Sequence, residues 1–102
     1  MILVTGWVKL GAGEIARLRG AAAAMRAATL QEPGCLAYDF SNDLEDADCL
    51  RISERWADEA ALTAHFGTPH MAVFNQALGG AMIEGASVKV YAGEFVRTIL
   101  GD

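Results

Sequence analysis

The stretch ERWADEAALTAHFGTPHMAVF, residues 54–74, contains the clearest structural signals in the chain. It begins as the end of a strand, and Asp58 is placed to cap a short helix. Gly67 interrupts that helix. Thr68 followed by Pro69 is then typical of the start of a second helix, because proline is favoured at the first helical position. The stretch therefore predicts a strand end followed by two short helices.

The segments before this stretch predict a strand, a helix and a hairpin. Residues 1–10 are rich in β-formers and have apolar side chains on both faces. Residues 14–30 repeat apolar side chains every three or four positions, which is the period of a helix. A proline–glycine pair ends this helix. Residues 35–41 and 49–56 then alternate apolar and polar side chains, and an acidic turn joins these two predicted strands.

The hairpin register follows from matching the apolar faces of its two strands. Pairing Ser41 with Cys49 aligns these faces and sets Asp39 opposite Arg51, and opposite charges facing each other stabilise a strand pair. The same register places Glu54 on the apolar face. A carboxylate in that position is costly unless it is paired, hydrogen-bonded or protonated. Glu54 is therefore the most conspicuous candidate for a functional residue.

A last strand is predicted over residues 87–98, which completes the order β-α-β-β-α(α)-β. With short connections and right-handed crossovers, this order predicts an α+β, ferredoxin-like split βαβ fold, with helices on one face of a four-stranded antiparallel sheet. A length of 102 residues predicts a single domain over residues 1–102. Since 53% of the residues are hydrophobic and one sheet face has no helix to cover it, we expect a homodimer in which two sheets meet.

Composition excludes several classes of protein. A net charge of −5, with eight scattered Lys and Arg residues, argues against a nucleic-acid partner. There is no apolar run near the roughly 18 residues of a membrane span and no signal-peptide pattern, so we expect no membrane partner and a cytoplasmic location. Cys35 and Cys49 match no zinc spacing and are too few for a disulfide framework.

The titratable residues predict a general-base site. His65 and His70 are five residues apart across a helix break, whereas a helical zinc pair needs a spacing of four, so no metal site is predicted. The motifs of nucleophilic triads and of nucleotide-binding loops are missing, so neither a nucleophilic triad nor a nucleotide cofactor is predicted. We therefore expect Glu54 to form a hydrogen-bonded pair with a histidine and to take a proton from a phenol or enol.

Aromatic residues near this predicted site suggest a pocket for a flat ligand. Tyr38, Trp56 and Phe74 would supply apolar walls, and Trp7 is a fourth candidate for substrate binding. Taken singly, Tyr38, Trp56 and Phe74 are better explained as part of the core. On the predicted first helix, Arg19 and Arg26 lie on one edge, where they either cover core residues or face a ligand.

The segment EPGCLAYDF, residues 32–40, together with residues 54–74, resembles the antibiotic biosynthesis monooxygenase superfamily, especially its small quinol-monooxygenase-like members. The resemblance implies a dimeric α+β barrel with a pocket between helices and sheet in each subunit. It also implies that O₂ oxygenates a small aromatic substrate, a quinol or polycyclic phenol, without metal, flavin or haem. Glu54, His65 and His70 would then supply the base.

The resemblance leaves other functions open. Haem-degrading relatives have a tryptophan where His65 stands and an iron-ligating histidine where Asn75 stands, which argues against haem cleavage. Relatives that isomerise a small carbonyl signalling compound share much of the same pattern of glutamate, histidine and Thr-Pro-His. A non-catalytic, dimeric ligand-binding domain is the third possibility, favoured if the chain's own side chains fill the pocket.

Overall fold

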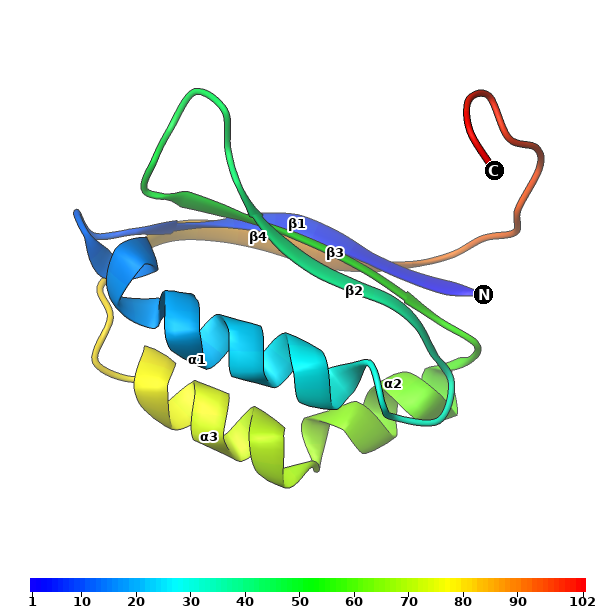
Figure 1. Ribbon diagram of the computed structural model, residues 1–102, viewed down its shortest axis with the longest axis horizontal. Helices are drawn as coiled ribbons and strands as arrows, with labels where there is room; N and C mark the ends of the chain where they lie inside the picture. Colours follow the sequence, from blue (N-terminus) through cyan, green and yellow to red (C-terminus); the bar gives the residue numbers. More distant parts are fainter.

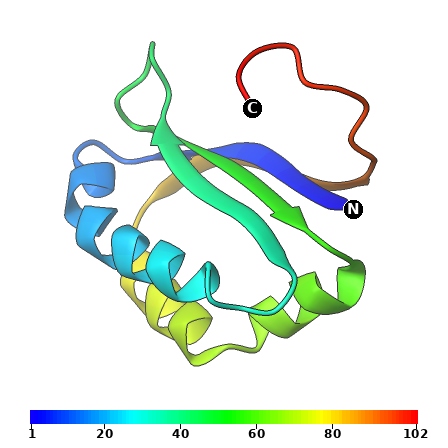
Figure 2. The same ribbon diagram turned by 45° about the vertical axis from the view of Figure 1, so that its right-hand side comes forward.

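The computed structural model describes residues 1–102 and confirms the predicted order of elements. One antiparallel sheet has the strand order β2-β3-β1-β4. All three helices cover the same face of this sheet (Figure 1), and the turned view shows the other face without helices (Figure 2). The elements are β1 (Ile2–Leu10), α1 (Glu14–Thr29), β2 (Cys35–Asn42), β3 (Cys49–Trp56), α2 (Glu59–Phe66), α3 (Pro69–Leu78) and β4 (Ile83–Ala92).

The two short helices begin as their capping residues predict. The Asp58 carboxylate accepts a hydrogen bond from the backbone N–H of Ala61 at 2.8 Å, and α2 starts directly after Asp58. The Thr68 hydroxyl accepts from the backbone N–H of Met71 at 3.3 Å, and Pro69 opens α3. None of the three helices has both the length and the apolar character needed to cross a bilayer.

The predicted hairpin register is wrong by two residues. Tyr38 lies opposite Glu54, and Asn42 lies opposite Leu50. The turn is tighter than expected, because the backbone N–H of Asp43 donates to the carbonyl of Cys49 at 3.0 Å and extends the pairing. A shift of two residues leaves every side chain on its predicted face.

The ion pair predicted from that register does not form either. Arg51 pairs with Asp43 at 2.9 Å, at the base of the turn, while Asp39 pairs with Arg26 of α1 at 3.1 Å. Both pairs follow from the observed register, which places Ser53 opposite Asp39.

The last strand starts and ends earlier than the predicted residues 87–98. β4 pairs only with β1, and Ala92 lies opposite Ile2, where β1 begins. The alternating pattern continues beyond Ala92, but no strand remains there to accept its backbone hydrogen bonds. Alternation alone therefore did not determine where the strand ends.

The core lies between the helices and the sheet. Trp56, which is fully buried, packs there with residues from β1, β2 and all three helices. The core members are Ile2, Val4, Met25, Tyr38, Trp56, Leu62 and Phe74. Side chains alternate between the two faces along a strand. Since Ile2 and Val4 point into the core, Trp7 on the same strand points to the opposite, uncovered face of the sheet.

Gly6 is expected to tolerate no side chain. A Cβ at this position would lie 2.1 Å from the Ser87 carbonyl oxygen and 2.6 Å from the Val88 Cα, both backbone atoms of β4. Gly6→Ala should therefore push β1 and β4 apart and lower the free energy of unfolding by about 1–3 kcal/mol. Gly20→Ala is the matched control, because nothing lies within 4 Å of its Cβ.

In the control variant, alanine on α1 should raise the free energy of unfolding by up to about 1 kcal/mol, since glycine is a poor helix former. Urea denaturation of both variants measures the difference. Equal stability of the two variants would contradict the close β1–β4 approach.

Candidate active site

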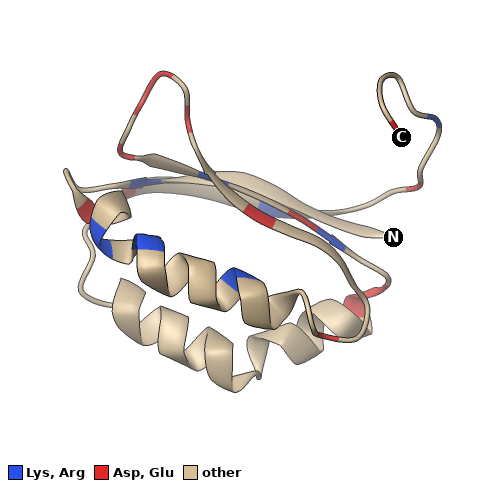
Figure 3. Cartoon of the chain, in the orientation of Figure 1, with Lys and Arg blue, Asp and Glu red and all other residues tan.

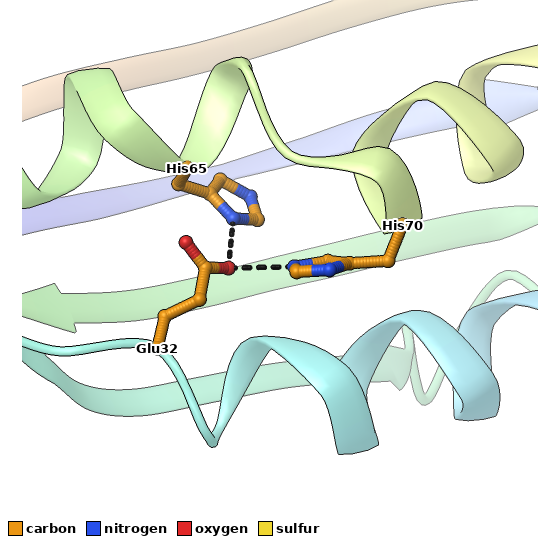
Figure 4. Close-up of side chains that lie close together, drawn as sticks. All are labelled: Glu32, His65 and His70. Atoms are coloured by element: carbon orange, nitrogen blue, oxygen red, sulfur yellow. Dashed lines mark hydrogen bonds and ion pairs between the residues drawn. The ribbon is translucent and has the colours of Figure 1, made fainter.

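Two histidines and one glutamate meet at the end of the sheet where β2 begins. Glu32 lies in the turn between α1 and β2, His65 in the last turn of α2 and His70 in the first turn of α3. The Oε2 atom of Glu32 is 2.7 Å from His65 Nδ1 and 2.7 Å from His70 Nε2 (Figure 4). We call these three residues the Glu–His₂ cluster.

The break between α2 and α3 brings the two rings together. The Thr68 hydroxyl donates to the carbonyl of His65 at 2.7 Å, which closes α2, and the same hydroxyl caps α3. The turn that carries Glu32 is held by hydrogen bonds from Cys35 N–H to the Glu32 carbonyl and from Ala57 N–H to the Gly34 carbonyl. His65 and His70 are five residues apart across this break, and their rings therefore both point at one oxygen atom of Glu32.

The shared oxygen determines which ring nitrogens bear protons. An ionised carboxylate only accepts hydrogen bonds, so each ring donates to Oε2, His65 from Nδ1 and His70 from Nε2. A neutral ring then keeps a lone pair on its other nitrogen. His70 is the accessible one of the two bases, with a side chain 23% exposed against 1% for His65.

Glu54 lies inward, as predicted, but its hydrogen-bond partner is different. Its side chain is on the helix-covered face of β3 and is 8% exposed. The Trp56 indole N–H donates to Glu54 Oε1 at 2.9 Å, whereas the predicted hydrogen bond to a histidine does not form. The reason is that Glu32, which lies between the two rings, already accepts from both of them.

Burial raises the pKa of the Glu54 carboxyl above its usual range. The Trp56 hydrogen bond and the nearby His65 ring lower this pKa, but only in part. The buried, ionised carboxylate therefore destabilises the fold at neutral pH, because the unfolded chain solvates the charge better.

Glu54→Gln is expected to raise the free energy of unfolding at pH 7. A glutamine oxygen can still accept from Trp56, and the buried charge is gone. The Glu54 pKa is higher in the folded than in the unfolded chain. The destabilisation by the buried charge is therefore absent below the unfolded pKa near 4.5, and it grows as the pH rises through the folded pKa. Urea denaturation from pH 4 to 8 should show the advantage of the variant shrinking on acidification. A constant difference would contradict this explanation.

A mainly apolar pocket of about 350 Å³ lies between α1 and the sheet. The rings of Phe40 and Phe74 stack in its wall with centroids 5.6 Å apart. The pocket is lined by Leu10, Ile15, Leu18, Arg19, Ala22, Ala23, Arg26, Phe40, Ser41, Asn42, Leu50 and Phe74. Trp56 and Phe74 therefore do not close the space beneath the helices.

The predicted ligand-binding residues fall in three different places. Phe74 lines the pocket, Tyr38 and Trp56 are buried in the core, and Trp7 lies on the far face of the sheet. The Tyr38 ring separates the pocket from the Glu–His₂ cluster, since its centroid is 5.3 Å from that of Phe40 and 5.3 Å from that of His65. The predicted base residues lie beside this aromatic layer and do not line the pocket.

Sequence reasoning missed Glu32 as a member of the site. The signal was its position directly before the Pro33–Gly34 pair, in the turn that follows the end of α1 at Thr29. An acid in a turn is normally read as a solvated residue, yet the Glu32 side chain is 11% exposed. Only the fold shows that this turn faces the break between α2 and α3.

Comparison with known proteins agrees with this architecture. The family model for antibiotic biosynthesis monooxygenase matches residues 1–77, which is most of the chain. An uncharacterized protein of Synechocystis sp. is 33% identical over 60 residues, which is 59% of this chain and 41% of that protein. The match thus spans less than half the length of that relative.

Solved structures resemble the chain over nearly its whole length. A Deinococcus radiodurans structure that bears the same family name is 28% identical, with a TM-score of 0.86 over 99% of this chain and 100% of that chain. A Mycobacterium tuberculosis protein is 25% identical, with a TM-score of 0.82 over 95% and 98% of the two chains.

A Nitrosomonas europaea structure with a TM-score of 0.86 over 93% of this chain and 100% of that chain is 17% identical, so its likeness concerns the fold alone. The family match covers β1, β2, β3, α1, α2 and nearly all of α3, and it includes the Glu–His₂ cluster, whereas β4 lies beyond it. This chain belongs to the antibiotic biosynthesis monooxygenase family.

Proposed function

We propose that this protein is a monooxygenase that transfers one atom of O₂ to a quinol or polycyclic phenol without a bound cofactor. The observation that carries the proposal is a mainly apolar pocket that only the Tyr38 ring separates from a carboxylate orienting two imidazole bases. A pocket of about 350 Å³ is within the size range of small-molecule sites.

The pocket walls suit a flat, weakly acidic aromatic ligand. Phe40 and Phe74 offer ring faces for stacking. Arg26 is engaged with Asp39, whereas Arg19 makes no ion pair and adds a positive charge to the lining. α3, which supplies Phe74 to the pocket, contains no Lys, Arg, Asp or Glu (Figure 3). A phenolate formed in the pocket would be stabilised by Arg19.

His70 is the base best placed to serve this pocket. His70 and Phe74 are four residues apart on α3, so they lie on the same helix face about one turn apart. A ligand that stacks on Phe74 and extends along α3 approaches the free His70 Nδ1. Glu32 stabilises the imidazolium that forms when His70 takes up the proton, and His65 holds Glu32 in place from its other side.

The substrate supplies every electron in the proposed reaction. After the phenolic proton moves to His70, the anion passes one electron to O₂, and the resulting radical and superoxide combine into a peroxide. The peroxide takes up the stored proton, and the O–O bond then breaks together with the C–H bond at the attacked ring carbon, whose hydrogen is the second hydrogen of the water that forms. One oxygen atom remains in the oxidised product, and the other leaves as water.

Oxygen uptake with a reduced naphthoquinone such as menadiol tests the proposal. Chelator-treated protein should accelerate uptake well above the spontaneous oxidation rate, and ¹⁸O₂ should place one labelled atom in the product. Uptake that does not exceed the protein-free rate across a panel of quinols and polycyclic phenols would contradict the proposed function.

We also propose that the protein is a homodimer. After Gly93 donates a backbone hydrogen bond to the Met1 carbonyl, the chain runs beyond the sheet (Figure 1). The apolar residues of this segment are 72–93% exposed: Phe95, Val96, Ile99 and Leu100. Such a segment gains stability by packing on a second copy. Light scattering should give the mass of a dimer, and a monomer at micromolar concentration would contradict the proposal.

A further inference from the structure

We propose that the Glu–His₂ cluster is also a binding site for a divalent transition-metal ion of the zinc class, and that the bound ion switches off the base. The binding rests on the geometry of Glu32, His65 and His70 alone. The loss of activity rests on the proposed function as well.

The three donor atoms are already close to the separation that a metal ion needs. Glu32 Oε2, His65 Nδ1 and His70 Nε2 all lie within 4.8 Å of one another, and the two oxygen–nitrogen separations are 2.7 Å. Zinc bonds of about 2.0–2.2 Å in tetrahedral geometry separate neighbouring donors by about 3.3 Å. The carboxylate oxygen therefore has to retreat from each nitrogen by about 0.6 Å, and the two ring nitrogens, which lie within 4.8 Å of each other, have to settle at about the same 3.3 Å separation.

The donor set has the chemistry of an open zinc site. Two imidazoles and one carboxylate leave a fourth position for water or for a ligand. No Lys or Arg is paired with Glu32 or with Glu54, so no side-chain cation competes with the ion for these carboxylates. The charge of Glu54, which already acts on His65, adds to the attraction.

Access to the cluster is from the side of His70. The side chains of Glu32 and His70 are 11% and 23% exposed, whereas the His65 side chain is only 1% exposed. All three donors are held by helix ends or by a hydrogen-bonded turn, so little conformational freedom is lost on binding. An ion can thus enter between α3 and the turn that carries Glu32.

Coordination and proton uptake exclude each other at His70. In the free cluster His70 bears its proton on Nε2 and accepts on Nδ1. A metal on Nε2 displaces that proton, and the neutral ring then bears it on Nδ1. The nitrogen proposed to receive the phenolic proton is thereby blocked. Because ligating nitrogens must be unprotonated, affinity should also fall on acidification.

Zinc titration of the chelator-treated full chain, without substrate, tests the site. Competition with a chromophoric zinc indicator should give one ion per chain, and the ring ¹⁵N resonances of the two histidines should both shift on binding. Glu32→Gln and His70→Gln should each weaken binding at least tenfold. Cys35→Ser, next to the cluster, and Glu45→Gln, in the acidic turn, are the controls and should bind as the wild type does.

Each result decides a separate part of the proposal. Absence of stoichiometric binding, unchanged affinity in His70→Gln, or loss of binding in Cys35→Ser would overturn the site. If zinc binds but quinol-dependent oxygen uptake continues at full occupancy, the inhibition is overturned. If metal-free protein shows no oxygen uptake while zinc still binds, the proposed function fails and the metal site stands.

Discussion

Glu32→Gln is expected to reduce quinol-dependent oxygen uptake about 100-fold, the lower end of what general base catalysis contributes. The amide can still accept a hydrogen bond, but it has no charge to stabilise the imidazolium. The loss should appear in kcat rather than in KM, because Glu32 does not line the pocket. Steady-state oxygen-electrode kinetics with a reduced naphthoquinone measure both constants.

A matched control separates this effect from a general change in charge. Glu59→Gln removes an exposed carboxylate from the first turn of α2, away from both rings, and should leave kcat unchanged. His70→Gln should lose as much activity as Glu32→Gln, and the double variant little more, because residues that act as a unit are not additive. Wild-type kcat in Glu32→Gln would remove the cluster from the mechanism.

Trp56→Ala is expected to lower the free energy of unfolding by about 3–5 kcal/mol. Trp56 is completely buried at the centre of the core, with its ring centroid 4.9 Å from that of His65 and 6.4 Å from that of Tyr38. Truncation leaves a large cavity and removes the donor that Glu54 uses. Small domains have only about 5–15 kcal/mol of stability, so this variant should unfold at low urea concentration.

Trp56→Phe separates the two parts of that loss. Phenylalanine keeps most of the ring volume but has no N–H, so the Glu54 carboxylate loses its hydrogen bond, at a cost of about 1.5–3 kcal/mol for a charged acceptor. In a Glu54→Gln background the same substitution should cost less, because a neutral amide is easier to leave without a partner. If Trp56→Ala unfolds within 1 kcal/mol of the wild type, the central role of Trp56 in the core is wrong.

The fold was predictable because its signals are local. The caps at Asp58 and Thr68 mark where helices begin, and alternation assigns Glu54 and Trp56 to the covered face. The register error and the early end of β4 share one cause. A pattern of period two defines faces but not which residue lies opposite which, and the partners depend on the Asp43 turn and on the length of β1.

The site was predictable only in part, because it is assembled from distant segments. The sequence marks His65, His70 and Glu54 as polar groups bordering apolar surfaces, and all three do lie at the covered side of the sheet. Their partners depend on where the α1–β2 turn falls, and that turn brings Glu32 between the rings. Glu54 consequently accepts its hydrogen bond from the Trp56 indole N–H instead of from a histidine.

Ionisation of a bound phenol, followed anaerobically by absorbance, is the most direct test of the proton-accepting cluster. A polycyclic phenol whose anion has a distinct absorption band would be titrated with protein at pH 7. The wild type should bind it as the phenolate, whereas His70→Gln and Glu32→Gln should bind it in neutral form. Identical spectra of the bound phenol in all three proteins would contradict the proposal that the Glu–His₂ cluster is the base.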